Sequence, residues 1–395
     1  MISENASLIS AGYSADNRIE FIHGGREYFR QLLKMIDEAK ETIHLQTYIY
    51  VNDVTGKQVA DALKQAAARH VEVYLLVDGY ASQELAPSFI YELEQSGIHF
   101  RFFEPIFKSK YYYFGRRLHH KLVVTDTRNA MVGGINISDN YNDMPGKPAW
   151  LDFAIYVEGE IARELCVLCW KTWKSYPARM GLTPCEEKKL DFDFRSEESS
   201  WVRMRRNDWV RRKNQVSKSY LGILRQARSE IIIVSSYFLP GKEFRKKIAE
   251  AAQRGVKVKL VLAGVSDVAI AKQAERHMYR WLLKNNIEIF EYRPAVLHGK
   301  MAICDEQWMT IGSYNVNNIS AFASIELNID IMNERFVRHV KESMQTIIET
   351  DCSHITANYF TLHNHFVRRA WQEICYELIR VIFFLFTFYF SQKEK

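Results

Sequence analysis

Residues 119–126 read HHKLVVTD, and residues 298–305 read HGKMAICD. Six residues further on, each stretch is followed by a second short segment, GGIN at 133–136 and GSYN at 312–315. Both copies fit the pattern H-x-K-x4-D-x6-G-[GS]-x-N. Fixed residue types at fixed offsets, occurring twice in one chain, indicate an internal duplication rather than chance. The chain is therefore expected to consist of two related halves.

Both motifs are rich in β-branched and apolar residues, which favours a β-strand. Side chains two apart on a strand share a face, so His119 and Lys121 are expected to point the same way, as are their counterparts in the second copy. A turn-like segment at 127–129 predicts a hairpin whose return strand brings Asn136 back beside Lys121. The intervening His120 points to the opposite face, and we interpret it as a bystander.

The residue types around each strand suit a phosphate group. Lysine supplies a charged donor and asparagine a neutral one, while a small residue lets the backbone approach a ligand. The predicted phosphate-binding positions are Asn136, Asn315, Gly134 and Ser313, together with Lys121 and Lys300. Gly134 lacks the hydroxyl that Ser313 carries, so the two half-sites are expected to be chemically inequivalent.

The histidines are then the reactive groups. If the two halves face each other, His119 and His298 flank one phosphorus atom. One attacks as a nucleophile and the other protonates the leaving oxygen. Asp126 and Asp305 complete the catalytic motif. Each lies five residues beyond its lysine and on the other strand face, and we interpret both as supporting residues. The cationic side chains already stabilise phosphoryl charge, so we expect no metal and no cofactor.

This doubled motif resembles that of the phospholipase D superfamily, and the chain is most similar to the short bacterial cardiolipin synthases. The resemblance covers roughly residues 20 to 360. It implies a bilobal fold and an acid beyond each motif that orients the histidine. By that resemblance Asp152 would support His119, and Glu326 would support His298. The two offsets differ, 33 residues against 28.

The duplication extends beyond the motifs. AKETI at 39–43 corresponds to ARSEI at 227–231, and AAARHVEV at 66–73 corresponds to AAQRGVKV at 251–258. Helical and strand patterns alternate, with helices expected at 27–39 and 59–69 and strands at 43–51 and 71–77.

We therefore expect an α/β protein of two repeated phospholipase D-like units. Each unit is a mixed β-sheet flanked by helices, related by pseudo-two-fold symmetry with the active site at the interface. The predicted domains are residues 1–195 and 196–395.

Composition sets further limits. At 395 residues, 47% hydrophobic and 25% charged, the chain is long enough for two domains with cores of their own. Its net charge of +6 includes clustered cations at 203–213 and at Lys108, Lys110, Arg116 and Arg117. Such basic patches suit an anionic lipid surface or nucleic acid.

Cys166 and Cys169 are interpreted as buried structural thiols, and the six scattered cysteines indicate no disulfide framework. Residues 1–20 lack the basic start and apolar core of a cleaved signal peptide. Together these features favour the cytoplasmic side of the cell membrane, with peripheral or monotopic attachment.

Two segments point to lipid. Residues 106–117 interleave aromatic and basic side chains before His119, as at a membrane interface or a stacking platform for single-stranded nucleic acid. Residues 381–390 read VIFFLFTFYF, an uncharged run too short to cross a bilayer. We expect this tail to lie in one leaflet, and the alternative is packing in the core.

The function favoured by these observations is a phosphatidyltransferase of the cardiolipin synthase type. It would act on phospholipids, with phosphatidylglycerol as the expected substrate, through a phosphohistidine intermediate. The alternatives are a phospholipase D hydrolase and a phosphodiesterase or nuclease that uses the same histidines. A non-enzymatic binding protein is the third possibility, and the two intact half-sites argue against it.

Overall fold

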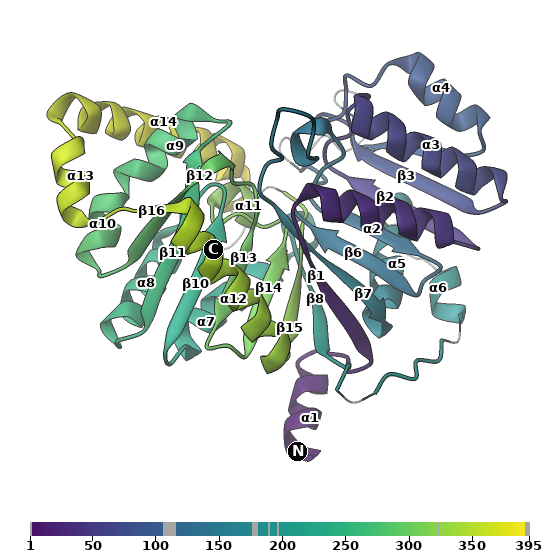
Figure 1. Cartoon of the computed structure of the whole chain (residues 1–395), viewed down its shortest axis with the longest axis horizontal. Coiled ribbons are helices and arrows are strands. Elements are labelled where there is room, and N and C mark those ends of the chain that lie inside the picture. Colours follow the sequence, from purple (N-terminus) through teal and green to yellow (C-terminus); the bar gives the residue numbers. More distant parts are fainter. Residues whose placement is uncertain are drawn as a thin grey trace.

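The computed structural model describes residues 2–105, 116–175, 181–188, 190–195, 197–322 and 324–391, without the side chains of 2–5, 322 and 385–391. Within these residues the strands form two sheets, one in each half of the chain, and the helices cover their faces (Figure 1). The strands of the first sheet lie between residues 17 and 159 and those of the second between 201 and 354. The division at 195/196 falls between the two sheets.

The first sheet has seven described strands in the order β1-β7-β6-β5-β2-β3-β4. β2, β3 and β4 are parallel and the other pairings are antiparallel. The bounds are β1 Asn17–His23, β2 Thr42–Thr47, β3 Glu72–Asp78, β4 His99–Phe103, β5 Lys121–Thr125, β6 Asn129–Gly133 and β7 Phe153–Gly159. The predicted strand at 43–51 is thus shorter than expected, because the chain leaves the sheet after Thr47.

The second sheet has nine described strands in the order β16-β12-β11-β10-β13-β14-β15-β8-β9. The bounds are β8 Trp201–Asp208, β9 Lys213–Asn214, β10 Glu230–Ser235, β11 Lys257–Val265, β12 Glu288–Val296, β13 Met301–Cys304, β14 Trp308–Gly312, β15 Glu326–Met332 and β16 Cys352–His354. From β12 to β8 this order repeats the order from β4 to β1 in the first sheet. The predicted fold class, two repeated α/β units with mixed sheets, is therefore confirmed.

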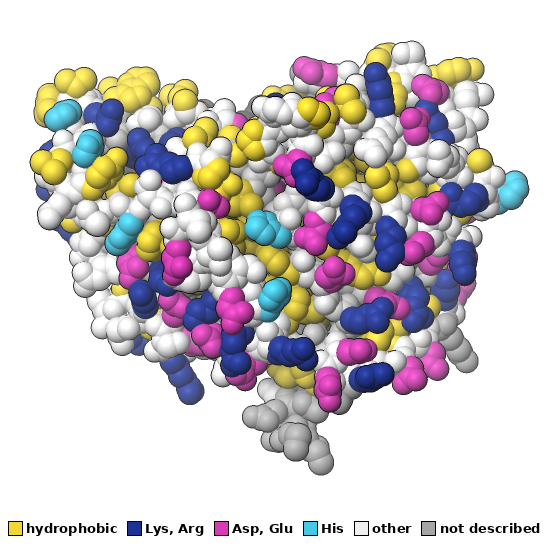
Figure 2. Space-filling view, in the orientation of Figure 1, with side chains coloured by type: hydrophobic (Ala, Val, Ile, Leu, Met, Phe, Trp, Pro, Cys, Tyr) yellow, Lys and Arg dark blue, Asp and Glu magenta, His cyan; other side chains and the backbone are white. Residues whose placement is uncertain are grey.

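Helices fill the connections. Their bounds are α1 Ile2–Ser10, α2 Gly25–Glu38, α3 Val54–Ala68, α4 Pro87–Gln95, α5 Glu160–Trp173, α6 Pro184–Glu187, α7 Gln215–Gln226, α8 Lys242–Gln253, α9 Ala269–His277, α10 Tyr279–Lys284, α11 Asn318–Phe322, α12 Glu334–Asp351, α13 Ala357–His363 and α14 Phe366–Ser391. The predicted helices at 27–39 and 59–69 correspond to α2 and α3. In the space-filling view the two lobes meet at a hollow in the upper margin of the molecule (Figure 2).

The β5–β6 and β13–β14 hairpins both turn through two residues with positive φ. These are Asp126 (53°) and Thr127 (64°) in the first half, and Asp305 (51°) and Glu306 (59°) in the second. Two successive left-handed residues give the tight turn the twist that a hairpin needs, and aspartate tolerates this conformation better than most residues. The predicted hairpins are confirmed, and the motif aspartate stands at the turn.

Each of these aspartates also binds the start of a neighbouring strand. Asp126 accepts hydrogen bonds from three successive backbone N–H groups, those of residues 40–42, at 2.8–3.0 Å. Asp305 does the same for residues 228–230 at 2.7–2.9 Å. The five-residue strand β5 separates Asp126 from Lys121, a span of roughly 15 Å. We therefore propose a structural role for Asp126 and Asp305, in keeping with their interpretation as supporting residues.

Two further expectations are corrected. Cys166 on α5 forms a disulfide with Cys185 on α6, so the prediction of free thiols fails for this pair, while Cys169 is free and buried. Cys185 lies 19 residues beyond Cys166, so a search for short cysteine motifs does not find the pair.

Several of the predicted patch cations are also neutralised. Buried Arg116 pairs with Glu104 and Asp208, and Arg203 pairs with buried Asp330. These cations therefore link chain segments. Lys108, Lys110 and most of the aromatic-basic segment fall in 106–115, outside the described residues.

The apolar tail at 381–390 belongs to the last part of α14. Phe383 packs into the core of the second half, while Val381 is exposed. The side chains from 385 onward lie outside the described residues. Of the helices in the described part of the chain, none combines the length and apolar character needed to cross a bilayer.

Candidate active site

The histidines lie where the two sheets meet. His119 stands two residues before β5 and His298 three residues before β13, each at the strand end nearest the other half. A parallel backbone bridge joins Leu118 to Ile325, and His119 N–H donates to the Ile325 carbonyl at 3.1 Å. The residues that follow these partners, His119 and Glu326, are thereby held side by side.

The same arrangement recurs in the other direction. A parallel bridge joins Leu297 to Leu151, and His298 N–H donates to the Leu151 carbonyl at 2.8 Å. His298 is thereby placed next to Asp152, which precedes β7 of the first half. The first motif is thus connected by backbone hydrogen bonds to the start of β15. The second motif is connected in the same way to the start of β7, the counterpart of β15 in the first half.

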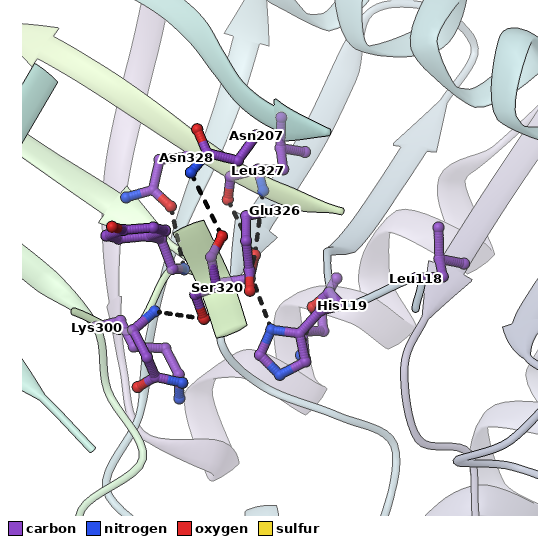
Figure 3. Close-up of polar contacts among 12 residues, drawn as sticks. Leu118, His119, Asn207, Lys300, Ser320, Glu326, Leu327 and Asn328 are labelled. Atoms are coloured by element: carbon purple, nitrogen blue, oxygen red, sulfur yellow. Dashed lines mark hydrogen bonds and ion pairs between the residues drawn. The ribbon is translucent and has the colours of Figure 1, made fainter. Parts of the chain in front are cut away.

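The carboxylates follow this crossed backbone pattern. Glu326 Oε2 lies 2.9 Å from His119 Nδ1 (Figure 3), and Asp152 Oδ2 lies 2.6 Å from His298 Nδ1. Both acids are buried. The structure brings together the predicted acids and histidines, but the predicted pairing within each half is wrong. Order along the chain associates each acid with its own motif, whereas the bridges across the seam decide which histidine it meets.

The carboxylates define the proton positions on the imidazoles. An ionised carboxylate only accepts hydrogen bonds, so we assign the proton of each ring to Nδ1 and leave Nε2 unprotonated. Although burial alone would raise it, the hydrogen bond from His298 lowers the pKa of Asp152 and keeps that carboxyl ionised. The unprotonated Nε2 is the atom that can attack phosphorus or exchange a proton with a leaving oxygen.

Burial lowers the positive charge of the site. It lowers the pKa of both histidines, that of His298 to about 4 with a further contribution from Lys300. Burial and nearby Lys300 lower the pKa of Lys121 to about 7, and burial lowers that of Lys300 to about 8. Lys300 lowers the pKa of Lys121, and Lys121 in turn helps to lower the pKa of His298. The cations of the two halves therefore lie close together.

The lysines lie beneath the histidines. Lys121 Nζ donates to the His119 carbonyl at 2.5 Å and lies 5.2 Å from the centre of the Tyr48 ring. Lys300 Nζ donates to the His298 carbonyl and to Ser236 Oγ, the latter at 3.0 Å. Both side chains are almost fully buried, so an anion entering the site would meet charges that water screens poorly.

The asparagines differ in their contacts. Asn136 Nδ2 donates to the Tyr141 hydroxyl at 2.8 Å, and its Oδ1 accepts from Ile49 N–H at 3.1 Å. The backbone N–H of Asn315 donates to Ser320 Oγ at 3.3 Å. Both asparagines are buried beside the loops that carry the active-site residues. This contact connects the Asn136 amide, through the Tyr141 hydroxyl, to His298.

The motif asymmetry has a structural counterpart. Ser313 Oγ donates to Glu326 Oε2, so the serine hydroxyl fastens the acid that orients His119. At Gly134 a Cβ atom would lie 2.3 Å from Asp152 Oδ1, so a side chain there would displace the acid that orients His298. The glycine therefore provides the space that the aspartate occupies, and the serine supports the longer glutamate.

Two tyrosines border the histidines. The Tyr48 ring meets His119 edge-on at 4.9 Å between centroids, and the Tyr141 hydroxyl lies 3.3 Å from His298 Nε2. The repeat of Tyr48 as Tyr237 in the second half was a signal for the first of these. Tyr141 was missed, because the position related to it by the motif offset is Ser320. Buried His120 faces Gln46 at 2.9 Å, away from the site, as predicted.

Comparison with known proteins follows the same division into halves. The family described as "Cardiolipin synthase, PLD-like domain" matches residues 32–145 and 220–348. Cardiolipin synthase B of Escherichia coli K12 is 34% identical over 342 residues, covering 86% of this chain and 82% of that protein. Cardiolipin synthase 1 of Bacillus cereus is 27% identical over 362 residues, covering 90% and 70%.

Solved structures agree on the fold. The phosphatidylserine synthase of Haemophilus influenzae Rd KW20 superposes with a TM-score of 0.73 at 14% sequence identity, covering 96% of this chain and 98% of that one. The polyphosphate kinase of Porphyromonas gingivalis superposes with a TM-score of 0.58, also at 14% identity, over 86% of this chain and 49% of that one. At such identity these matches concern architecture alone.

Proposed function

The chain belongs to the phospholipase D-like cardiolipin synthase family, and on that premise we propose that it transfers a phosphatidyl group from one phosphatidylglycerol molecule to another. The observation that carries the proposal is the crossed site, in which two histidines, each held by a carboxylate of the opposite half, converge with two buried lysines. Such a site can divide one phosphodiester exchange into two substitutions at phosphorus.

In the first step, Nε2 of one histidine attacks the phosphorus of the donor lipid. The bond from phosphorus to the headgroup oxygen breaks, and the protonated second histidine gives its proton to that oxygen, releasing glycerol. The phosphatidyl group is then held by a P–N bond. Lys121 and Lys300, with Asn136 and Asn315, stabilise charge on the phosphoryl oxygens.

In the second step, the now neutral second histidine takes the proton of the acceptor's hydroxyl. The acceptor oxygen attacks phosphorus, the P–N bond breaks, and cardiolipin leaves with both histidines restored. The anionic phosphodiester favours the protonated form of the acid histidine, which burial holds neutral in the empty site. The substrate thus helps to create the acid that its own cleavage requires.

The charges outside the site give no support to a nucleic-acid substrate. Arg203 and Arg116, two of the cations that predicted a binding patch, pair with the buried carboxylates Asp330 and Asp208. Cations engaged in this way are poorly placed to neutralise a run of backbone phosphates. We propose an anionic membrane surface as the partner, with peripheral attachment.

The predicted cytoplasmic side belongs to the same proposal. The Cys166–Cys185 disulfide weighs against it, because such bonds are more usual in oxidising compartments. Alkylation of these two cysteines in freshly lysed cells would support a reducing side, and resistance to alkylation until reductant is added would oppose it.

Product analysis tests the reaction. Purified protein incubated with phosphatidylglycerol labelled in its glycerol headgroup should release labelled glycerol and form cardiolipin, in equal amounts. Phosphatidic acid as the sole lipid product would identify a hydrolase instead. Cleavage of DNA without any change in the lipid would identify a nuclease. The same turnover should persist in excess chelator, and loss of activity that one divalent metal restores would contradict the metal-free mechanism.

A further inference from the structure

Large apolar side chains are exposed along one face of α14. Val367, Trp371, Ile374, Leu378 and Val381 are each between 45% and 78% exposed. They follow one another at intervals of four, three, four and three residues, so they lie in one stripe along the helix. We call these five residues the α14 stripe. A soluble surface rarely carries so many large apolar side chains in one row.

The opposite face of α14 is firmly packed. Cys375 and Phe383 are buried in the core of the second half. The ring of Tyr376 stacks on His277 at the end of α9, with 4.6 Å between centroids. The helix is therefore held in place by its own domain, and the stripe is exposed because nothing in the described chain covers that face.

Basic residues accompany the stripe. Arg368 and Arg380 are exposed on α14. Arg380 forms an exposed ion pair with Glu377 and also lines an open groove of about 500 Å³ between α14 and the start of α8. The groove contains Lys242 and Arg245 beside apolar Leu239. A row of apolar side chains flanked by cations matches the two layers of a membrane interface, acyl chains and anionic headgroups.

The groove lies between the packed side of α14 and the loop after β10. Leu239 lies in the loop after β10, and its N–H donates to the Val316 carbonyl at 2.9 Å, one residue beyond Asn315. The same loop begins at Ser236, the hydroxyl that contacts Lys300. The helix α14 therefore lies beside the loops that lead to the second half-site, and the stripe occupies its exposed side.

Other strand-end loops near the site also expose apolar side chains. In the first half these include Val51 after β2 and Tyr80 after β3, with Val54 at the start of α3, and in the second half Val268 after β11, with Ile270 in the first turn of α9. The ends of β2 and β3 lie at the edge where β5 begins, which is the edge that carries His119. Hydrophobic side chains accordingly appear along the upper margin of both lobes, on either side of the hollow (Figure 2).

We propose that the α14 stripe and these strand-end loops together form the surface on which the protein rests on an anionic bilayer, with the mouth of the active site facing the lipid. This inference rests on the proposed function for the identity of the substrate, but the surface stands on its own geometry. A partner helix would fit the stripe's spacing. It would leave the apolar loops of the other half uncovered, whereas a bilayer covers both.

Vesicle binding tests the surface. The variant carrying Trp371→Ser, Ile374→Ser and Leu378→Ser should need on the order of 100-fold more lipid for half-maximal binding to phosphatidylglycerol-containing vesicles, because three large apolar side chains no longer enter the interface. Leu182→Ser is the matched control: Leu182 is 72% exposed but lies outside this surface, and its loss should leave binding unchanged. Binding by the triple variant equal to that of the unaltered protein would overturn the proposal.

Two further readouts separate the alternatives. Turnover of a short-chain, monomeric phosphatidylglycerol should be retained by the triple variant, since it needs no bilayer. If the unaltered protein binds vesicles but turns over no lipid, the proposed function fails and the surface stands. If the substitutions instead convert a dimer to a monomer and leave vesicle binding unchanged, the stripe is an interface between copies of this chain.

Fluorescence gives a test that does not depend on the triple variant folding. Brominated lipids should quench part of the tryptophan emission of the unaltered protein, and Trp371→Phe should remove that quenched part. No quenching difference between the two proteins, with both bound to vesicles, would contradict insertion of the stripe.

Discussion

The two half-sites share one motif but hold their acids differently. In the second half Ser313 donates a hydrogen bond to Glu326, the acid of His119. In the first half Gly134 leaves the space in which Asp152, the acid of His298, is packed. The acids differ by one methylene, and the small residues differ by one hydroxymethyl group. The residue at the variable position of the motif therefore contacts the acid of its own half. Through that acid it affects the histidine of the other half.

Removal of either histidine should have the largest effect. His119→Ala and His298→Ala should each lower kcat by at least about 10⁴-fold, because nucleophile and acid are both required and neither can replace the other. Release of labelled glycerol from phosphatidylglycerol measures this, with His120→Ala as the control outside the site. Near-normal rates in either single variant would contradict the two-histidine mechanism.

Exchanging the small residues should separate the two half-sites. Gly134→Ser should lower kcat by roughly 10²-fold or more, because its Cβ collides with Asp152 and moves the carboxylate away from His298. Ser313→Gly removes one hydrogen bond from Glu326 and should cost about 10-fold or less. Thermal unfolding of both variants provides the control for folding. Equal losses from the two substitutions would show that the asymmetry has no role.

The lysines predict an alkaline limit on activity. Because the pKa of Lys121 is lowered to about 7 and that of Lys300 to about 8, the empty site loses its cations as the pH rises through this range. The value of kcat/KM on a soluble substrate should therefore fall from pH 7 to pH 9. His298, with a pKa near 4, ionises outside this range and should add no inflection of its own between pH 7 and pH 9. A kcat/KM that continues to rise above pH 8 would contradict buried, weakly basic lysines.

The motif aspartates should show the smallest effect on activity. Asp126→Ala and Asp305→Ala each leave three backbone N–H groups without their carboxylate partner, which should lower the free energy of unfolding by about 1–3 kcal/mol. Denaturant titration measures the loss. The kcat of the folded fraction should stay within about twofold of the unaltered protein, because the histidines lie at the other end of the strands. A large loss of kcat in a fully folded variant would show that these aspartates take part in catalysis.

Much of this arrangement could be predicted from the sequence because it is local or repeated. The β5–β6 hairpin follows from strand propensity and a turn, and the second half repeats it. The identity of the two acids followed from family resemblance. Their pairing could not be predicted, because it depends on the Leu118–Ile325 and Leu151–Leu297 bridges, which form only when two sheets meet.

The misses share the same physical origin. Cys185 meets Cys166 through the folding back of a connecting segment, and Tyr141 reaches His298 across the seam between the halves. Arg203 carries a charge that suggested a surface patch, yet it pairs with Asp330 from a strand more than a hundred residues away. Periodicity and short motifs report contacts within an element or a hairpin. Contacts between segments distant in the chain leave no such pattern.

Histidine resonances measured by NMR test the crossed site most directly. In protein labelled at histidine, the signals of His119 and His298 can be assigned from His119→Gln and His298→Gln. Asp152→Asn should shift the Nδ1 resonance of His298 and leave that of His119 nearly in place, and Glu326→Gln should do the reverse. Perturbation of His119 by Asp152→Asn, with His298 unaffected, would contradict the account and restore pairing within each half.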